Sequence, residues 1–170
     1  MSPTDYLIDS ALVLLVLLQL KERKLTTRAL VRPIVILGAA VANYFHGLPT
    51  AGNDLVLVSA LALTGATIGV ASGLSVLMRR DRDGDVLARA GWTSACFWVL
   101  GMGSRFAFLV WATHGGASAL GSFSAQHAIT AAAWTPALLG MAVCEVLGRS
   151  GALALRRHQL EAPGIPELAA

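Results

Sequence analysis

Residues 54–78 read DLVLVSALALTGATIGVASGLSVLM, and this stretch decides the class of the protein. After Asp54 it contains no charged residue. A helix needs about 20 mostly apolar residues to cross the hydrocarbon core of a lipid bilayer. The stretch is therefore predicted to be a transmembrane helix.

The rest of the chain repeats this layout. Of 170 residues, 55% are hydrophobic and 14% are charged, whereas soluble domains carry about 25% charged residues. The polar residues form short clusters between long apolar runs, which is typical of a polytopic membrane protein. We predict an all-α bundle of five transmembrane helices. The predicted spans are residues 6–20, 30–46, 54–78, 88–113 and 127–148.

The basic residues set the predicted orientation. Of the 13 Lys and Arg residues, all but Arg105 lie in or at the edges of three segments: between spans one and two, between spans three and four, and after span five. Cytoplasmic loops of membrane proteins are enriched in Lys and Arg. The N-terminus is therefore predicted to lie outside. Residues 150–170 are predicted to form a partly disordered cytoplasmic tail, in which residues 150–160 extend as a short helix. The expected location is the bacterial cytoplasmic membrane. The net charge of +3 is explained by these loops, so we expect no nucleic-acid partner.

A row of glycines predicts a close helix contact. Gly65, Gly69 and Gly73 recur every four residues and share one face of the third predicted span. Small residues at this spacing let two helix backbones approach closely inside lipid. Gly38 in span two suggests a seam between spans two and three. The alternative is an interface between two copies of the chain.

Arg105 is the residue most suggestive of function. It lies inside the fourth predicted span, where a cation is costly and normally faces the bundle interior or a wet cavity. Asp9, in the outer part of span one, is the expected partner. Glu145 is predicted near the inner end of span five and ranks as the poorer partner. The Arg105–Asp9 pair is interpreted as structural or as part of a substrate or proton site.

Histidines and cysteines leave weaker alternatives open. Three histidines, His46, His114 and His127, map to the outer ends of the predicted spans. They are either ordinary polar residues of the membrane interface or ligands of a metal or haem. Cys96 and Cys144 lie in spans four and five and are ordinary small apolar residues or a thiol pair. No cofactor is predicted from these patterns.

Several short motifs lie in the same order as in a known family. Residues 28–33 (RALVRP) lead into span two, residues 83–89 (DGDVLAR) lead into span four, and Arg105 lies within span four. With Gly65 and Gly69 between them, this order resembles the CcdC-like family of small bacterial membrane proteins. The resemblance implies the same topology, an important Arg105 and a link to cytochrome c biogenesis loci. It implies no specific activity.

The sequence thus predicts a non-enzymatic accessory or partner-binding subunit of the membrane. Its expected partners are the lipid bilayer and another membrane protein or a second copy. One alternative is a small transporter or proton-linked permease with Arg105 and Asp9 in its path. The other is a membrane haem or thiol redox protein.

Overall fold

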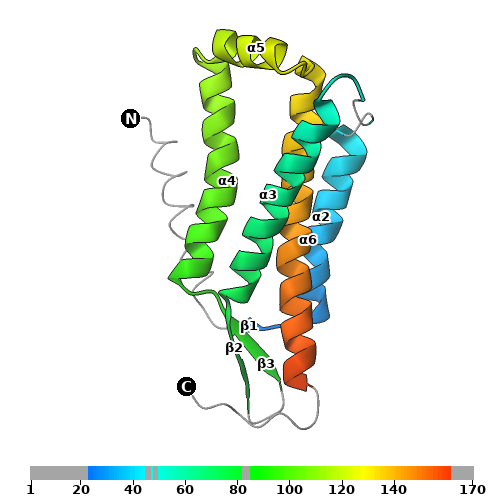
Figure 1. Cartoon of the computed structure of the whole chain (residues 1–170). Helices are drawn as coiled ribbons and strands as arrows, with labels where there is room; N and C mark the ends of the chain where they lie inside the picture. Colours follow the sequence, from blue (N-terminus) through cyan, green and yellow to red (C-terminus); the bar gives the residue numbers. More distant parts are fainter. Residues whose placement is uncertain (1–22, 45–46, 48–49, 82–84, 162–170) are drawn as a thin grey trace, which may run out of the picture.

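The computed structural model describes residues 23–44, 47, 50–81 and 85–161, which are mostly helical (Figure 1). The helices are α2 (Thr27–Tyr44), α3 (Asp54–Leu74), α4 (Trp92–Thr113), α5 (Ala117–Gln126) and α6 (Trp134–Glu161), and a 3-10 turn, η1 (Ala131–Ala133), precedes α6. The long helices extend from one end of the bundle toward the other, α5 crosses one end, and a small sheet lies at the other end.

Three of these helices are long and apolar enough to cross a membrane: α3, α4 and the helical segment Ala131–Glu161. In α2 the apolar stretch is shorter, Leu30–Ala39. The predicted first span, residues 6–20, lies outside the described residues. Large side chains such as Leu63 and Phe106 are exposed, at 69% and 68%, while serines and carboxylates are buried. This inverted distribution fits a helical bundle whose solvent is lipid.

A small sheet corrects the expectation of an all-α fold. Strands β1 (Arg23–Lys24), β2 (Leu77–Arg80) and β3 (Val86–Arg89) are antiparallel in the order β1-β3-β2. The hairpin β2–β3 joins α3 to α4. The spans predicted as 54–78 and 88–113 therefore extended too far at this end. Apolar side chains continue into the strands, and hydropathy alone does not distinguish a short strand from the end of a helix.

The other end of the bundle also differs from the prediction. Residues 117–126, expected in a loop, form α5, which contacts Trp134 at the start of α6. Phe123 of α5 lies against Trp134 with ring centroids 6.4 Å apart, and Trp134 Nε1 donates a hydrogen bond of 3.1 Å to Ser124 Oγ. The helix predicted within residues 127–148 begins and ends later, because α6 runs from Trp134 to Glu161. The short helix expected for residues 150–160 is the continuation of α6.

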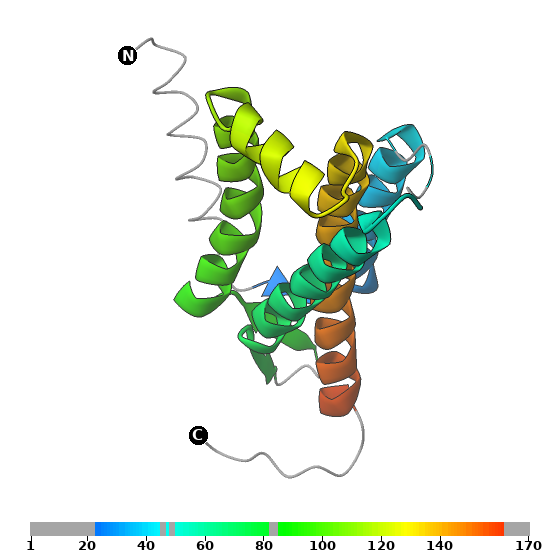
Figure 2. The same cartoon turned by 45° about the horizontal axis from the view of Figure 1, so that its top comes forward.

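Helices α3 and α6 form the main contact of the bundle, and they run in the same direction (Figures 1 and 2). A Cβ added to Gly65 would overlap the carbonyl oxygen of Met141, and one added to Gly69 would overlap that of Glu145. Gly73 is similarly close to Arg149. Each pair is 76 positions apart in the sequence, the separation that also joins Asp54 to Thr130. The two helices are therefore parallel and stay in register.

The predicted packing role of the glycine row is thus correct, but its predicted partner is wrong. The seam joins α3 to α6, whereas a Cβ on Gly38 would meet no atom within 4 Å. Span two was the predicted partner of the glycine row because it directly precedes span three in the chain. The close approach instead uses α6, in which Gly148 leaves room for the α3 backbone at Ala66 and Val70.

Polar contacts fix both ends of the α3–α6 pair. At one end the carboxylate of Asp54, which is 0% exposed, accepts hydrogen bonds of 2.7 Å from both the backbone N–H and the hydroxyl of Thr130. At the other end Arg156 Nη1 donates to the carbonyl oxygens of Gly73 (3.2 Å), Leu74 (2.9 Å) and Val76 (2.6 Å). The last carbonyls of a helix lack intrahelical partners and carry partial negative charge. Arg156 supplies both the donor and the opposite charge.

Replacing Gly69 with alanine should destabilise the bundle, because the new methyl group would collide with the backbone of Glu145. We expect a loss of about 1–3 kcal/mol, as in other overpacked cores. Thermal unfolding in mild detergent, followed by circular dichroism, measures the change. Gly38→Ala is the matched control, and it should be neutral or slightly stabilising because alanine favours helix. Equal destabilisation by both variants would contradict the assigned seam.

Candidate functional site: a buried ion pair between α4 and α6

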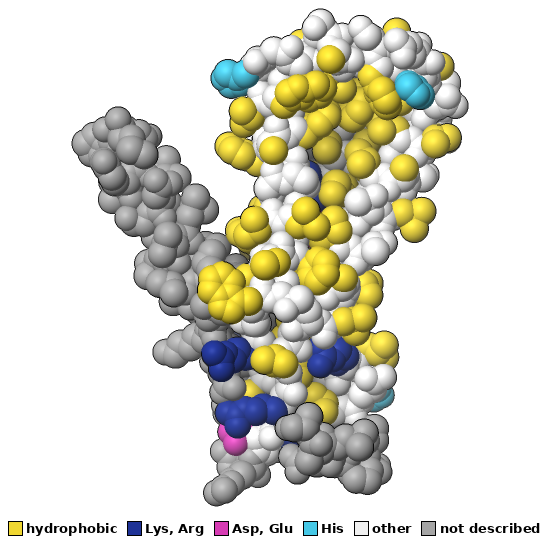
Figure 3. Space-filling model, turned by 60° about the vertical axis from the view of Figure 1, so that its left-hand side comes forward, with side chains coloured by type: hydrophobic (Ala, Val, Ile, Leu, Met, Phe, Trp, Pro, Cys, Tyr) yellow, Lys and Arg dark blue, Asp and Glu magenta, His cyan; other side chains and the backbone are white. Residues whose placement is uncertain are grey.

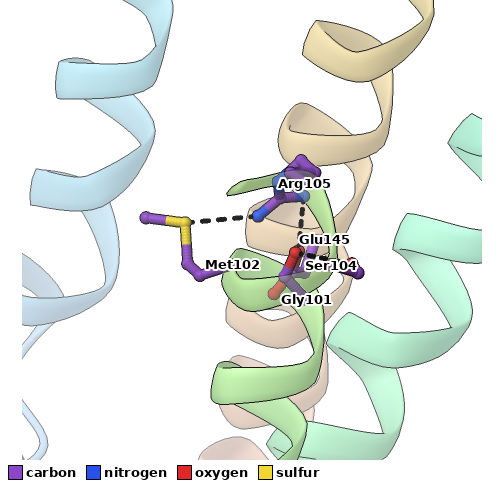
Figure 4. A network of polar contacts seen from close by, with 5 residues as sticks. All are labelled: Gly101, Met102, Ser104, Arg105 and Glu145. Atoms are coloured by element: carbon purple, nitrogen blue, oxygen red, sulfur yellow. Dashed lines mark hydrogen bonds and ion pairs between the residues drawn. The ribbon is translucent and has the colours of Figure 1, made fainter. Parts of the chain in front are cut away.

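Arg105 of α4 forms an ion pair with Glu145 of α6 (Figure 4). Arg105 Nη1 lies 2.7 Å from Glu145 Oε2, and Nη2 donates to the sulfur of Met102 at 3.4 Å. The two side chains are 16% and 10% exposed. A charge-assisted hydrogen bond of this length is among the stronger polar contacts in proteins.

Two glycines make room for Glu145. A Cβ on Gly101 of α4 would lie 2.6 Å from Glu145 Oε2 and closer still to Oε1. The backbone of Glu145 rests against Gly69 of α3. Three helices therefore meet at one residue, with the main chain of Glu145 against α3 and its carboxylate against α4. The ion pair depends on small residues in both neighbouring helices.

The ion pair lies well inside the helices. Arg105 is eight residues before the end of α4 at Thr113, or about 12 Å at 1.5 Å per residue. Glu145 is eleven residues after the start of α6 at Trp134, or about 17 Å. Both helices have these ends on the α5 side of the bundle (Figure 1). The flexible arginine side chain spans the difference in depth.

Further polar groups continue from the pair toward the sheet. Arg149 follows Glu145 by one helical turn, and their opposite charges attract. Its Nη1 donates to the hydroxyls of Ser72 in α3 and of Ser94 in α4, the latter at 3.0 Å. Ser94 Oγ also donates to the carbonyl oxygen of Ser72 at 3.4 Å. Charged and hydroxyl side chains thus line the α3–α4–α6 interior from Arg105 to the sheet end.

Glu145 is a direct partner of Arg105, although it was ranked from the sequence as the poorer candidate. It was expected near the inner end of its span, yet it makes an ion pair with Arg105. The reason is the length of α6, which ends at Glu161 and not near residue 148. Glu145 is therefore near the middle of the helix. Asp9, the expected partner, lies outside the described residues.

The histidines are not brought together where the structure describes them. His114 follows α4 and His127 follows α5, so the ten-residue helix α5, about 15 Å long, lies between them. Each Nδ1 contacts the backbone carbonyl four residues earlier, at 3.1 Å for His114 and 2.9 Å for His127. His46 lies outside the described residues. Within the described part of the chain, no three His, Cys, Asp or Glu residues are grouped to hold a metal ion.

The two cysteines are both free thiols. Cys96 is exposed on α4, and Cys144 is partly buried on α6. The structure gives no disulfide between them. The thiol-pair hypothesis therefore gains no geometric support and stays a prediction.

Several polar residues of the interior escaped the sequence analysis. Arg149 was counted as a loop cation, although its spacing of four residues from Glu145 is a signal for an ion pair on one helix face. Ser72 and Ser94 resembled ordinary small residues of transmembrane helices. The bond between Asp54 and Thr130 joins distant segments and left no local signal.

Comparisons with protein-family models, with curated proteins and with solved structures gave no match to this chain. The possible chemistry of the site is therefore inferred from its geometry. An arginine and a carboxylate in direct contact can fix two helices, hold a proton, or receive the charged group of a ligand or partner.

Breaking the ion pair on one side should cost more than removing it altogether. Arg105→Met or Glu145→Leu alone leaves an unpaired charge, for which we expect a loss of about 3–5 kcal/mol. The double variant Arg105→Met/Glu145→Leu should recover most of that loss, because a buried pair is replaced by apolar groups of similar size. Unfolding in mild detergent measures all three proteins.

The control for this cycle is the exposed pair Arg157–Glu161, whose atoms are also 2.7 Å apart. Arg157→Met should change stability by about 1 kcal/mol at most, as surface pairs do. If the single and double variants at Arg105 and Glu145 were additive, the two residues would not be coupled and the site would be misassigned.

Proposed function

We propose that the chain is a non-enzymatic, multi-pass protein of the bacterial cytoplasmic membrane that binds another membrane protein through α4. The proposal includes five spans, with the N-terminus outside and the C-terminus in the cytoplasm. It also includes kinship with the CcdC-like family and, through it, a link to cytochrome c biogenesis.

One observation carries the partner-binding role. Arg105 makes hydrogen bonds to Glu145 and Met102, whereas a guanidinium offers five donors. Its side chain remains 16% exposed at a depth where lipid tails supply no acceptor. The surface beside it is apolar, because Met102 and Phe106 are 51% and 68% exposed. A protein segment with an acceptor group fits this surface better than lipid does.

The charge distribution supports the orientation within this proposal. Arg79, Arg80 and Arg89 lie on the strands at the sheet end, and α6 carries Arg156 and Arg157 near the same end. Segments at the opposite end, such as α5, contain no Lys or Arg. Lys and Arg accumulate on the cytoplasmic side of membrane proteins, so the sheet is assigned to the cytoplasm.

Site-specific photo-cross-linking in native membranes tests the partner-binding role. A photoreactive residue in place of Met102 or Phe106 should give a cross-linked protein of one defined mass. The same residue in place of Leu63, which is 69% exposed on α3, is the control and should give lipid adducts only. Cross-links from 102 and 106 that end solely within residues 6–20 of the same chain would contradict partner binding at α4. So would a complete absence of protein cross-links.

A small proton-linked transporter is the second candidate. It is favoured by the polar side chains that continue from Glu145 through Arg149 to Ser72 and Ser94. Proteoliposomes containing a pH-sensitive dye distinguish the two roles. If the ion pair is structural, wild-type protein and the double variant Arg105→Met/Glu145→Leu should show the same slow proton flux. A faster flux in the wild type, lost in a folded double variant, would favour transport.

A further inference from the structure

The hairpin β2–β3 has two faces of different character. Leu77 is paired with Arg89 and Arg79 with Leu87, and residues directly opposite in an antiparallel pair share a face. These four residues therefore form one face of the hairpin, which we call the outer face. Leu77, Arg79 and Arg89 are exposed on it, Leu77 at 64%.

The opposite face of the hairpin is turned toward α6. Val86 on this face is 5% exposed. Arg80, its cross-strand partner, donates a hydrogen bond of 3.4 Å to the carbonyl oxygen of Leu160 at the end of α6. This face is therefore packed toward α6, whereas the outer face is turned away from the bundle.

The outer face stands directly at the end of two membrane-crossing helices. Strand β2 begins three residues after α3 ends, and β3 ends three residues before α4 begins. The paired residues Leu77 and Arg89 are therefore nearest to the helices. The hairpin extends about 13 Å beyond them, at about 3.3 Å per residue. The membrane surface consequently meets the hairpin at its Leu77–Arg89 end.

Residues near this boundary combine apolar and basic groups. Trp92, the first residue of α4, is 73% exposed and follows Arg89 by three positions. Tryptophan favours the headgroup level of a bilayer. Figure 3 shows Lys and Arg side chains gathered around hydrophobic ones over the end of the molecule that carries the sheet. Exposed apolar groups adjoin exposed cations where phosphates are expected.

We propose that the outer face of the hairpin, with Trp92, binds the headgroup of an anionic phospholipid. Leu77 and Trp92 contact the first acyl carbons, and Arg89 and Arg79 bind the phosphate oxygens, for which guanidinium geometry is well suited. Charge complementarity selects this occupant, because the face presents arginines beside apolar groups at membrane level. The inference rests on the proposed membrane location and is independent of a protein partner at α4.

Lipid retention by the full-length protein tests the site. The protein is purified in a neutral detergent and titrated with phosphatidylglycerol, and native mass spectrometry counts the bound lipid. Arg89→Gln and Arg79→Gln should each weaken binding about five-fold, the effect of one cation near an anionic surface. Arg89→Lys should retain most of the binding, and Leu77→Asn should reduce it. Circular dichroism verifies that each variant keeps the helical signal.

Arg157→Gln is the matched control, because it removes one positive charge at the same end of the molecule from helix α6 and not from the outer face of the hairpin. It should leave binding unchanged, because Arg157 is not part of the outer face. Three results would each overturn the proposal: equal weakening by Arg157→Gln, no weakening by either hairpin variant, or equally tight binding of phosphatidylcholine. These outcomes are separate from the cross-linking at α4, so the lipid site and the partner-binding role can fail independently.

Discussion

Direct contact between the backbones of α3 and α6 is the constraint on which the rest of the structure depends. Inside lipid there is no hydrophobic gain from bringing two apolar helices together, so association relies on close packing and polar contacts. Gly65, Gly69 and Gly73 remove the side chains that would keep the helices apart. The constant separation of 76 positions, shared with the Asp54–Thr130 contact, shows that the register is held over nearly the whole of α3.

The candidate site follows from this contact. Because Gly69 fixes the backbone of Glu145 against α3, the carboxylate is directed to α4, where Gly101 gives it space and Arg105 neutralises it. The parallel direction of α3 and α6 also requires the chain to return between them. Helix α4 makes that return, with the hairpin at one end and α5 at the other (Figures 1 and 2). Packing and polar site are thus two results of the same arrangement.

The sequence predicted the features that depend on local composition. Hydropathy located α3, α4 and α6, and the spacing of Gly65, Gly69 and Gly73 identified a packing face. It predicted the wrong helix for that face, because nearness in the chain says little about nearness in a bundle. It also missed the hairpin, since residues such as Leu77 and Val86 are apolar in either a helix or a strand.

The sequence identified Arg105, one of the two residues of the candidate site, but ranked the other, Glu145, as the poorer partner. A lone arginine within an apolar stretch identified Arg105, because burial of a cation is costly enough to be informative by itself. Glu145 was ranked as the poorer partner because its depth was misjudged, and that depth depended on where α6 ends. Helix ends are the least certain part of any sequence-based prediction. The Arg149 contacts to Ser72 and Ser94 are long-range and leave no pattern in the sequence.

Disulfide cross-linking tests the parallel α3–α6 contact most directly, in a background with Cys96 and Cys144 replaced by serine. Val58 lies beside Gly140, where an added Cβ meets no atom closer than 4.0 Å, so the cysteine pair 58/140 should form a disulfide in native membranes. The pair 58/152, with its second cysteine at the opposite end of α6, should not. A disulfide in 58/152, without one in 58/140, would mean that the helices are antiparallel and would contradict the account.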